Sequence, residues 1–215
     1  FYFCMPKACE EEAEKLYELA LALQSMEQPI PNTVSLKEQR ALIVTGANQG
    51  GKSTFLRSLG IAQVLCQAGM YVPAKKYPLY AYEDIFTHFT RREDATMNMG
   101  KFEEELKRME QILRAAKKNT LILLNESFAT TTEVTAYQIA MDLMHTCLSE
   151  AVTVWMVTHI TKFAKKLYGE HPENVLFLSA GRTEENEIRF QMYEKVPGDT
   201  SYGLTLYEQM IGKIN

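Results

Sequence analysis

The residues GANQGGKS, at positions 46–53, combine glycines, a lysine and a hydroxyl in the spacing of a loop that binds phosphate. Gly46 and Gly51 allow backbone N–H groups to turn towards an anion, and a helix that follows directs its positive N-terminal end at the same point. In this pattern Lys52 reaches the outer phosphates, and the Ser53 hydroxyl binds Mg²⁺. The run therefore predicts a nucleotide site, and the alternative is a glycine-rich turn that binds nothing.

Further polar residues come directly after two apolar runs. The run at 121–124 leads into Asn125 and Glu126, and the run at 152–158 leads into His159. Because ligands bind at the carboxyl ends of the strands in parallel sheets, we expect these residues to converge on the glycine-rich loop. The alternatives are structural, since Glu126 could be an ordinary charge at a helix N-terminus. A histidine at a strand end often makes only a structural hydrogen bond.

The spacing of apolar residues predicts the elements that position these groups. Strands are expected over 41–45, 84–90, 121–125 and 152–159, and helices over 10–24, 52–68, 100–117, 130–148 and 161–168. Gly69 should end the second of these helices, and Thr130 should form a capping box with Glu133. The end of the chain predicts an antiparallel strand pair, at 174–180 and 187–196, and a last helix at 203–212. This order predicts an α/β fold with a mostly parallel sheet, flanking helices and a peripheral antiparallel part.

Composition narrows the kind of protein further. The chain has 215 residues, of which 46% are hydrophobic and 23% charged, and its formal net charge of −4 argues against a main role in gripping nucleic acid. Its four cysteines lack metal-type or disulfide-type spacing and fit reduced thiols, hence a cytoplasmic location. No stretch is long and apolar enough to predict a membrane span. Because the chain starts at Phe1, we expect residues 1–28 to be a helical remnant of a preceding domain and 29–215 to be the main domain.

The longer stretch TGANQGGKSTFLRSLGIAQVLCQAGMYVPA, at 45–74, closely resembles the ATPase domain of the MutS mismatch-repair family. The likeness rests on a small set of positions: Asn48, Gly50, Gly51, Lys52, Ser53, Thr54, Arg57, Gly69 and the VPA at 72–74, followed by 85–87, 157–159 and SYGL at 201–204. It implies a P-loop ATPase of the ABC type that binds ATP or ADP with Mg²⁺. It also implies a homodimer with composite nucleotide sites, in which domains absent from this chain bind DNA.

The resemblance assigns roles to individual residues. Lys52, Glu126 and His159 would be catalytic, with Glu126 polarising the attacking water and His159 contacting the γ-phosphate. Ser53 and Asn125 would serve the metal ion. The residues that would bind the nucleotide are Ile30, Gly46, Asn48, Gly50, Gly51, Lys52, Ser53 and Thr54.

The chain departs from the family pattern inside this site. Asn125 stands where the family usually has Asp, and an uncharged amide should weaken Mg²⁺ binding without abolishing it. The segment 93–106 aligns with the family segment that acts across the dimer on the other chain's nucleotide. Gly100 replaces its usual Ser, so Asn98 or the N–H groups around Gly100 would take over that contact. The usual aromatic platform for adenine falls near Pro29, beside Ile30.

These observations lead to three hypotheses. The first is a Mg²⁺-dependent ATPase domain of a MutS-like, mismatch-repair-related DNA-binding protein, in which ATP clamps two chains together. The second is a nucleotide-gated dimerisation module with little or no hydrolysis, suggested by Asn125 and Gly100. The third is another ABC-type ATPase of chromosome maintenance.

Overall fold

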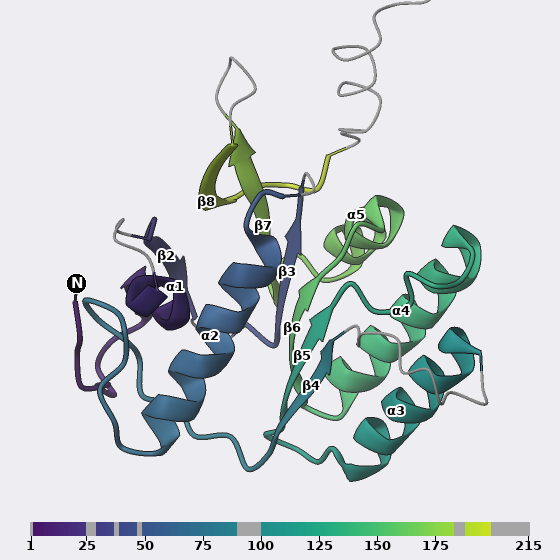
Figure 1. Ribbon diagram of the computed structural model, residues 1–215. Helices are drawn as coiled ribbons and strands as arrows, with labels where there is room; N and C mark the ends of the chain where they lie inside the picture. The colour runs from purple at the N-terminus through teal and green to yellow at the C-terminus, as the bar shows by residue number, and fades with distance from the viewer. Residues whose placement is uncertain are drawn as a thin grey trace, which may run out of the picture.

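The computed structural model describes residues 2–24, 29–36, 39–46, 49–89, 100–182 and 188–198. A six-stranded sheet lies at its centre, in the order β4-β5-β6-β3-β7-β8, and helices cover both of its faces (Figure 1). The strands are β3 (Ala41–Thr45), β4 (Ile85–Phe89), β5 (Leu121–Asn125), β6 (Thr153–Val157), β7 (Val175–Arg182) and β8 (Ile188–Glu194). All neighbours pair in parallel except β7 and β8, which are antiparallel. The predicted α/β fold, with its antiparallel part at one edge, is confirmed.

The helices divide between the two faces of this sheet (Figure 1). Helix α2 (Lys52–Gln67) covers one face, and α3 (Lys101–Ala115), α4 (Glu133–Ser149) and α5 (Thr161–Glu170) cover the other. Successive residues of β3 show the division, because Leu42 packs into the α2 core and Ile43 into the opposite core. A strand buried on both faces needs apolar residues at every position. The continuous apolar runs were therefore reliable predictors of the central strands.

Helix α2 ends as predicted. Its final turn is closed by Gly69, whose φ of 68° lies in the left-handed region, and the Gly69 N–H donates to the carbonyl of Cys66 at 3.1 Å. Glycine adopts this conformation at little cost, which is why it commonly follows the last helical residue.

The helix predicted over residues 10–24 is wrong. This segment forms strand β1 (Glu12–Leu16) and the short helix α1 (Leu19–Gln24), and β1 pairs antiparallel with β2 (Asn32–Ser35) in a separate two-stranded sheet. On its other side the backbone of Glu14 exchanges hydrogen bonds with residues 75 and 76. Ala13 and Leu16 pack into the same core as α2. Partners distant in the sequence thus override the local helical pattern.

The predicted capping box is also wrong. Helix α4 begins at Glu133, but its N-cap is Thr132, whose hydroxyl accepts a hydrogen bond from the Thr135 N–H at 3.3 Å. Thr130 instead donates its hydroxyl hydrogen to a carboxylate oxygen of Glu105 at 2.8 Å. The buried carboxylate on α3 draws Thr130 away from the helix end.

Several predictions fall outside the described residues: Asn48, Asn98, the first half of the 93–106 segment, SYGL at 201–204 and the helix at 203–212. Within the described part of the chain, no helix is both long and apolar enough to cross a lipid bilayer.

Candidate functional site

A cavity of about 660 Å³ opens beside the start of α2, where the glycine-rich loop and the residue after β5 meet. Its wall includes residues from both sheets, since Asn32 belongs to β2 and Phe190 to β8. A volume between about 300 and 1,000 Å³ is usual for sites that bind small molecules and cofactors. The cavity therefore has room for a nucleotide-sized ligand.

The loop between β3 and α2 adopts backbone conformations that require its glycines. Gly46 has a φ of 115°, and a Cβ there would lie 2.9 Å from the backbone N of Ala180. Gly51 has a φ of 81° and is packed against the ring of Phe190, while Gln49 between them also has a positive φ, of 65°. Only glycine takes up such angles beside close neighbours without strain. The two predicted glycines thus shape the loop.

Lys52, the first residue of α2, is buried within this wall. Its Nζ donates to the carbonyl of Gly46 at 3.0 Å, which folds the side chain back over the loop. Burial lowers the pKa of the Lys52 ammonium, and the nearby Glu126 carboxylate partly opposes that effect. A partly desolvated ammonium group in a cavity wall favours the binding of an anionic ligand. The negative charge of the ligand replaces the interactions with water that the ammonium group loses on burial.

Strand β5 ends at Asn125, and Glu126 follows it at the carboxyl edge of the parallel strands. Asn125 is paired with Val157 of β6, and the Glu126 N–H donates to the Val157 carbonyl at 2.9 Å. Glu126 has a φ of 51° and lines the cavity. The Oδ1 atom of Asn125 is buried and has no hydrogen-bond partner among the described residues. Asn125 itself is not among the described residues that line the cavity, but it directly precedes Glu126, which is. An unpartnered amide oxygen in this position could accept a hydrogen bond from a metal-bound water, so the residue types present fit Mg²⁺.

The loop after Glu126 is held by Glu105 of α3. One carboxylate oxygen of Glu105 accepts the Phe128 N–H at 2.9 Å, and the other accepts the Thr130 hydroxyl at 2.8 Å. His88 of β4 adds a second attachment, with its Nδ1 2.7 Å from the Ser127 hydroxyl oxygen and its Nε2 3.2 Å from the Glu105 carbonyl. The segment carrying Glu126 is therefore fixed from two neighbouring elements.

Sequence reasoning missed this network, although one signal was present. Glu105 lies three residues after Phe102 and four before Met109, on the apolar face of its helix. A carboxylate on a buried helix face needs a specific partner, and here it finds Phe128 and Thr130. Burial also lowers the pKa of His88, with the charge of nearby Arg108 adding to the effect, and so favours the neutral imidazole.

Phe190 is a second feature that the sequence did not reveal. It lines the cavity next to Gly51 of the loop and is held by Asn32, whose Nδ2 donates to the Phe190 carbonyl at 3.2 Å. The Oδ1 of Asn32 accepts the Met192 N–H at 2.7 Å. No local signal could identify this pair, because the asparagine and the aromatic ring are brought together only by the fold. The exposed ring gives the cavity an aromatic surface beside Ile30.

The cavity brings together six of the residues predicted for the site: Ile30, Gly51, Lys52, Ser53, Thr54 and Glu126. Gly46 and Gly50 belong to the loop itself.

His159 and Gly100 are placed differently. His159 follows β6 at the same edge of the sheet, but it is exposed and is not among the described residues that line the cavity. Gly100 is the exposed N-cap residue of α3, and it too lies outside that set.

The fold and the cavity define an α/β domain with a cavity beside a glycine-rich loop, at the carboxyl edge of its parallel strands. The family described as MutS domain V matches residues 42–212, which is most of the chain. The chain therefore belongs to the MutS family.

Curated relatives agree with this assignment. The chain is 28% identical over 202 residues to a mitochondrial DNA mismatch repair protein mutS homolog of Sarcophyton glaucum, covering 94% of this chain and 20% of that protein. It is 31% identical over 159 residues to endonuclease MutS2 of Aquifex aeolicus, covering 70% and 20%. It is 35% identical over 122 residues to the DNA mismatch repair protein MutS of Thermotoga neapolitana, covering 57% and 15%. The chain spans about a fifth of the length of the first two and less of the third.

Proposed function

We propose that this chain is the ATPase domain of a MutS-like DNA-binding protein of mismatch repair, built as a P-loop domain of the ABC type. The observation that carries the proposal is that a buried Lys52 and a nearby Glu126 line one cavity beside a glycine-rich loop. Membership of the MutS family supports it and argues against an ABC-type ATPase from outside that family.

Each predicted residue has a task in this proposal. Lys52 and the loop N–H groups bind the phosphates, and Glu126 accepts a hydrogen bond from the attacking water. Ser53 and Asn125 hold Mg²⁺, which when bound neutralises phosphate charge. Ile30 and Phe190 offer apolar and aromatic surface to the base. Most of the rate enhancement would then come from positioning and charge stabilisation.

The proposal includes a dimer. Asn98 and Gly100 of one chain would act on the nucleotide of the other, and ATP would clamp the two chains together. His159 would contact the γ-phosphate in that closed state. DNA would be bound by domains outside this chain, which agrees with its net charge of −4. The location proposed for this protein is the cytoplasm, because its four cysteines lack disulfide-type spacing.

Calorimetric titration with ATP and Mg²⁺ tests the site directly. Lys52→Gln should weaken ATP binding by about 10- to 100-fold, because a hydrogen bond to a charged group contributes roughly 1.5–3 kcal/mol. Lys162→Gln is the matched control, since Lys162 is exposed and lies outside the cavity. Binding that is equal in wild type and Lys52→Gln would remove the phosphate site from 46–53.

A second function is favoured by the uncharged Asn125 and by the missing hydroxyl at Gly100. The chain would then be a nucleotide-gated dimerisation module with tight ATP binding, ATP-dependent dimerisation and negligible phosphate release. Turnover like that of ordinary ATPases of this type would exclude it.

The variant Asn125→Asp distinguishes a slowed ATPase from an inactive one. A restored carboxylate should lower the Mg²⁺ concentration for half-maximal activity by about tenfold, as changes next to metal ligands commonly do, and should raise turnover. Phosphate release at varied Mg²⁺ measures both quantities. No change in either would mean that residue 125 is not close to the metal.

A further inference from the structure

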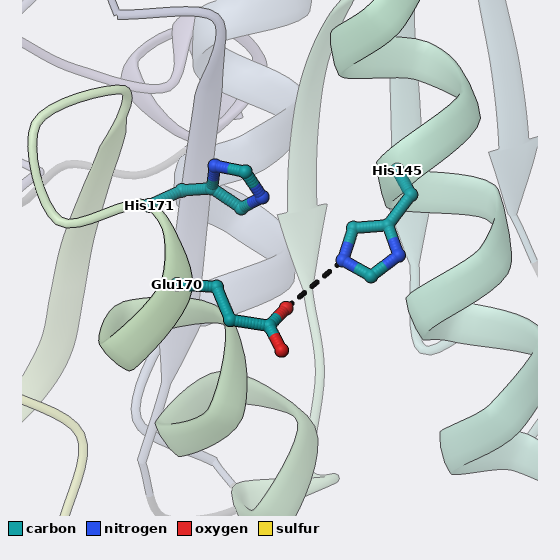
Figure 2. A group of neighbouring side chains, drawn as sticks. All are labelled: His145, Glu170 and His171. Atoms are coloured by element: carbon teal, nitrogen blue, oxygen red, sulfur yellow. Dashed lines mark hydrogen bonds and ion pairs between the residues drawn. The ribbon is translucent and has the colours of Figure 1, made fainter.

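Two histidines and a glutamate form a cluster outside the cavity. His145 projects from α4, and Glu170 and His171 stand at the C-terminal end of α5 (Figure 2). Figure 2 shows the three side chains directed into one space between the two helices. None of the three lines the nucleotide cavity, and nothing in the proposed ATPase mechanism uses them.

The spacing of their ligand atoms suits a metal ion. One nitrogen or oxygen atom of each residue lies within 4.8 Å of the other two, and the His145 Nε2 is 2.9 Å from the Glu170 Oε2. Ligands bound to tetrahedral Zn²⁺ at about 2.0–2.1 Å are about 3.3 Å apart. Small side-chain rotations would therefore bring all three atoms to metal-binding distances.

The backbone that carries these ligands is held in place. Helices α4 and α5 share one core, in which Met144 precedes His145 and Leu167 lies one turn before His171. The His171 N–H donates to the Leu167 carbonyl at 2.9 Å, which fixes the residue at the helix end. Lys166 pairs with Glu170 through the other carboxylate oxygen, Oε1, at 2.9 Å. The other oxygen, Oε2, meets the His145 Nε2, and a metal ion would take the place of the hydrogen shared by these two atoms.

We propose that His145, Glu170 and His171 bind a divalent transition metal ion, with Zn²⁺ as the best fit. Two imidazoles and one carboxylate are a known ligand set for Zn²⁺ with an open fourth position, and the partial exposure of His145 and Glu170 leaves that position to water. Imidazole ligands favour Zn²⁺, Cu²⁺ and Ni²⁺, whereas Mg²⁺ prefers oxygen ligands. This site is therefore chemically distinct from the proposed Mg²⁺ site and does not depend on nucleotide binding.

The expected consequence is a clamp between α4 and the end of α5. The ligands come from two helices, so the site exists only in the folded chain, and metal binding stabilises that state. Helix α5 begins at Thr161, two residues after His159, and leads through residues 171–174 into β7. A metal ion at its far end would restrain the helix without touching the cavity.

Titration of the tag-free, reduced chain with Co²⁺, followed by Zn²⁺ competition, tests the proposal. Wild type should develop visible absorption typical of nitrogen and oxygen ligands, and Zn²⁺ should displace the Co²⁺ and raise the melting temperature. His145→Ala, His171→Ala and Glu170→Gln should each weaken Co²⁺ binding by more than about tenfold, since even changes to residues behind the ligands cost 10- to 100-fold. Circular dichroism checks that each variant is folded.

Two matched controls sharpen the result. His159→Ala removes the other exposed histidine, and Cys9→Ser removes the exposed thiol, and both should bind Co²⁺ as wild type does. The proposal is overturned if wild type shows no Co²⁺ absorption, or if His145→Ala binds with unchanged affinity. The proposal is also overturned if Co²⁺ binding is lost in His159→Ala or Cys9→Ser and retained in the variants of the three proposed ligands.

Discussion

Replacement of Glu126 by glutamine should slow the proposed ATP hydrolysis by about 10²- to 10⁴-fold and leave ATP binding unchanged. Glutamine keeps the size of the side chain and one acceptor oxygen, but it cannot take a proton from water. The backbone position is set by the hydrogen bond from the residue 126 N–H to Val157, which the substitution retains. Phosphate release in a single turnover, together with calorimetric ATP binding, separates the chemical step from affinity.

Glu133→Gln is the control for this experiment. Glu133 is an exposed glutamate in the first turn of α4, seven residues further along the chain, and its loss should leave the rate unchanged. Equal rates for wild type and Glu126→Gln would remove Glu126 from catalysis. Such a result, combined with weak ATP binding by Lys52→Gln, would favour the dimerisation module over the ATPase.

Replacement of Glu105 by alanine should lower the free energy of unfolding by about 2–4 kcal/mol. The change leaves the buried Phe128 N–H without its acceptor, at roughly 1–3 kcal/mol, and removes a charged acceptor from the Thr130 hydroxyl. Because both partners lie in the loop after Glu126, hydrolysis should fall as well, with ATP affinity retained. Urea denaturation and steady-state kinetics measure the two effects.

Glu105→Gln and Glu103→Ala distinguish a positioning role from a general loss of charge on α3. Glutamine can still accept the Phe128 N–H and donate to the rotatable Thr130 hydroxyl, so it should retain most of the stability and the rate. Glu103 makes only an exposed ion pair with Lys107, worth about 0–1 kcal/mol. If Glu105→Ala is no less stable than Glu103→Ala, the network does not support the loop.

The central part of the fold could be predicted because its information is local. The strand at Leu121–Asn125 is apolar on both faces, and the glycines at 46 and 51 mark backbone angles that other residues avoid. The residues that converge on the cavity followed from the rule that parallel strands present their carboxyl ends at one edge. Six predicted site residues do line that cavity.

The parts that could not be predicted depend on long-range partners. Strand β1 has a helical pattern of charges, and only β2 and residues 75–76 make it a strand. Glu105 reads as one of three consecutive glutamates until Phe128 and Thr130 are placed beside it. Phe190 joins the cavity through Asn32, and no pattern within a few residues of either one encodes that contact.

The bond from Asn32 to Phe190 also has a kinetic consequence. It joins residues 158 positions apart, so one wall of the cavity combines β2, near the start of the described chain, with β8, the last strand that the structure describes. Contacts that close long loops form late in folding. The chain loses conformational entropy when such a loop closes, and the contact stabilises the chain only after that loss. During synthesis the partner of Asn32 emerges only after all the parallel strands. A nascent chain would therefore contain all five parallel strands of the central sheet before this wall of the cavity could close.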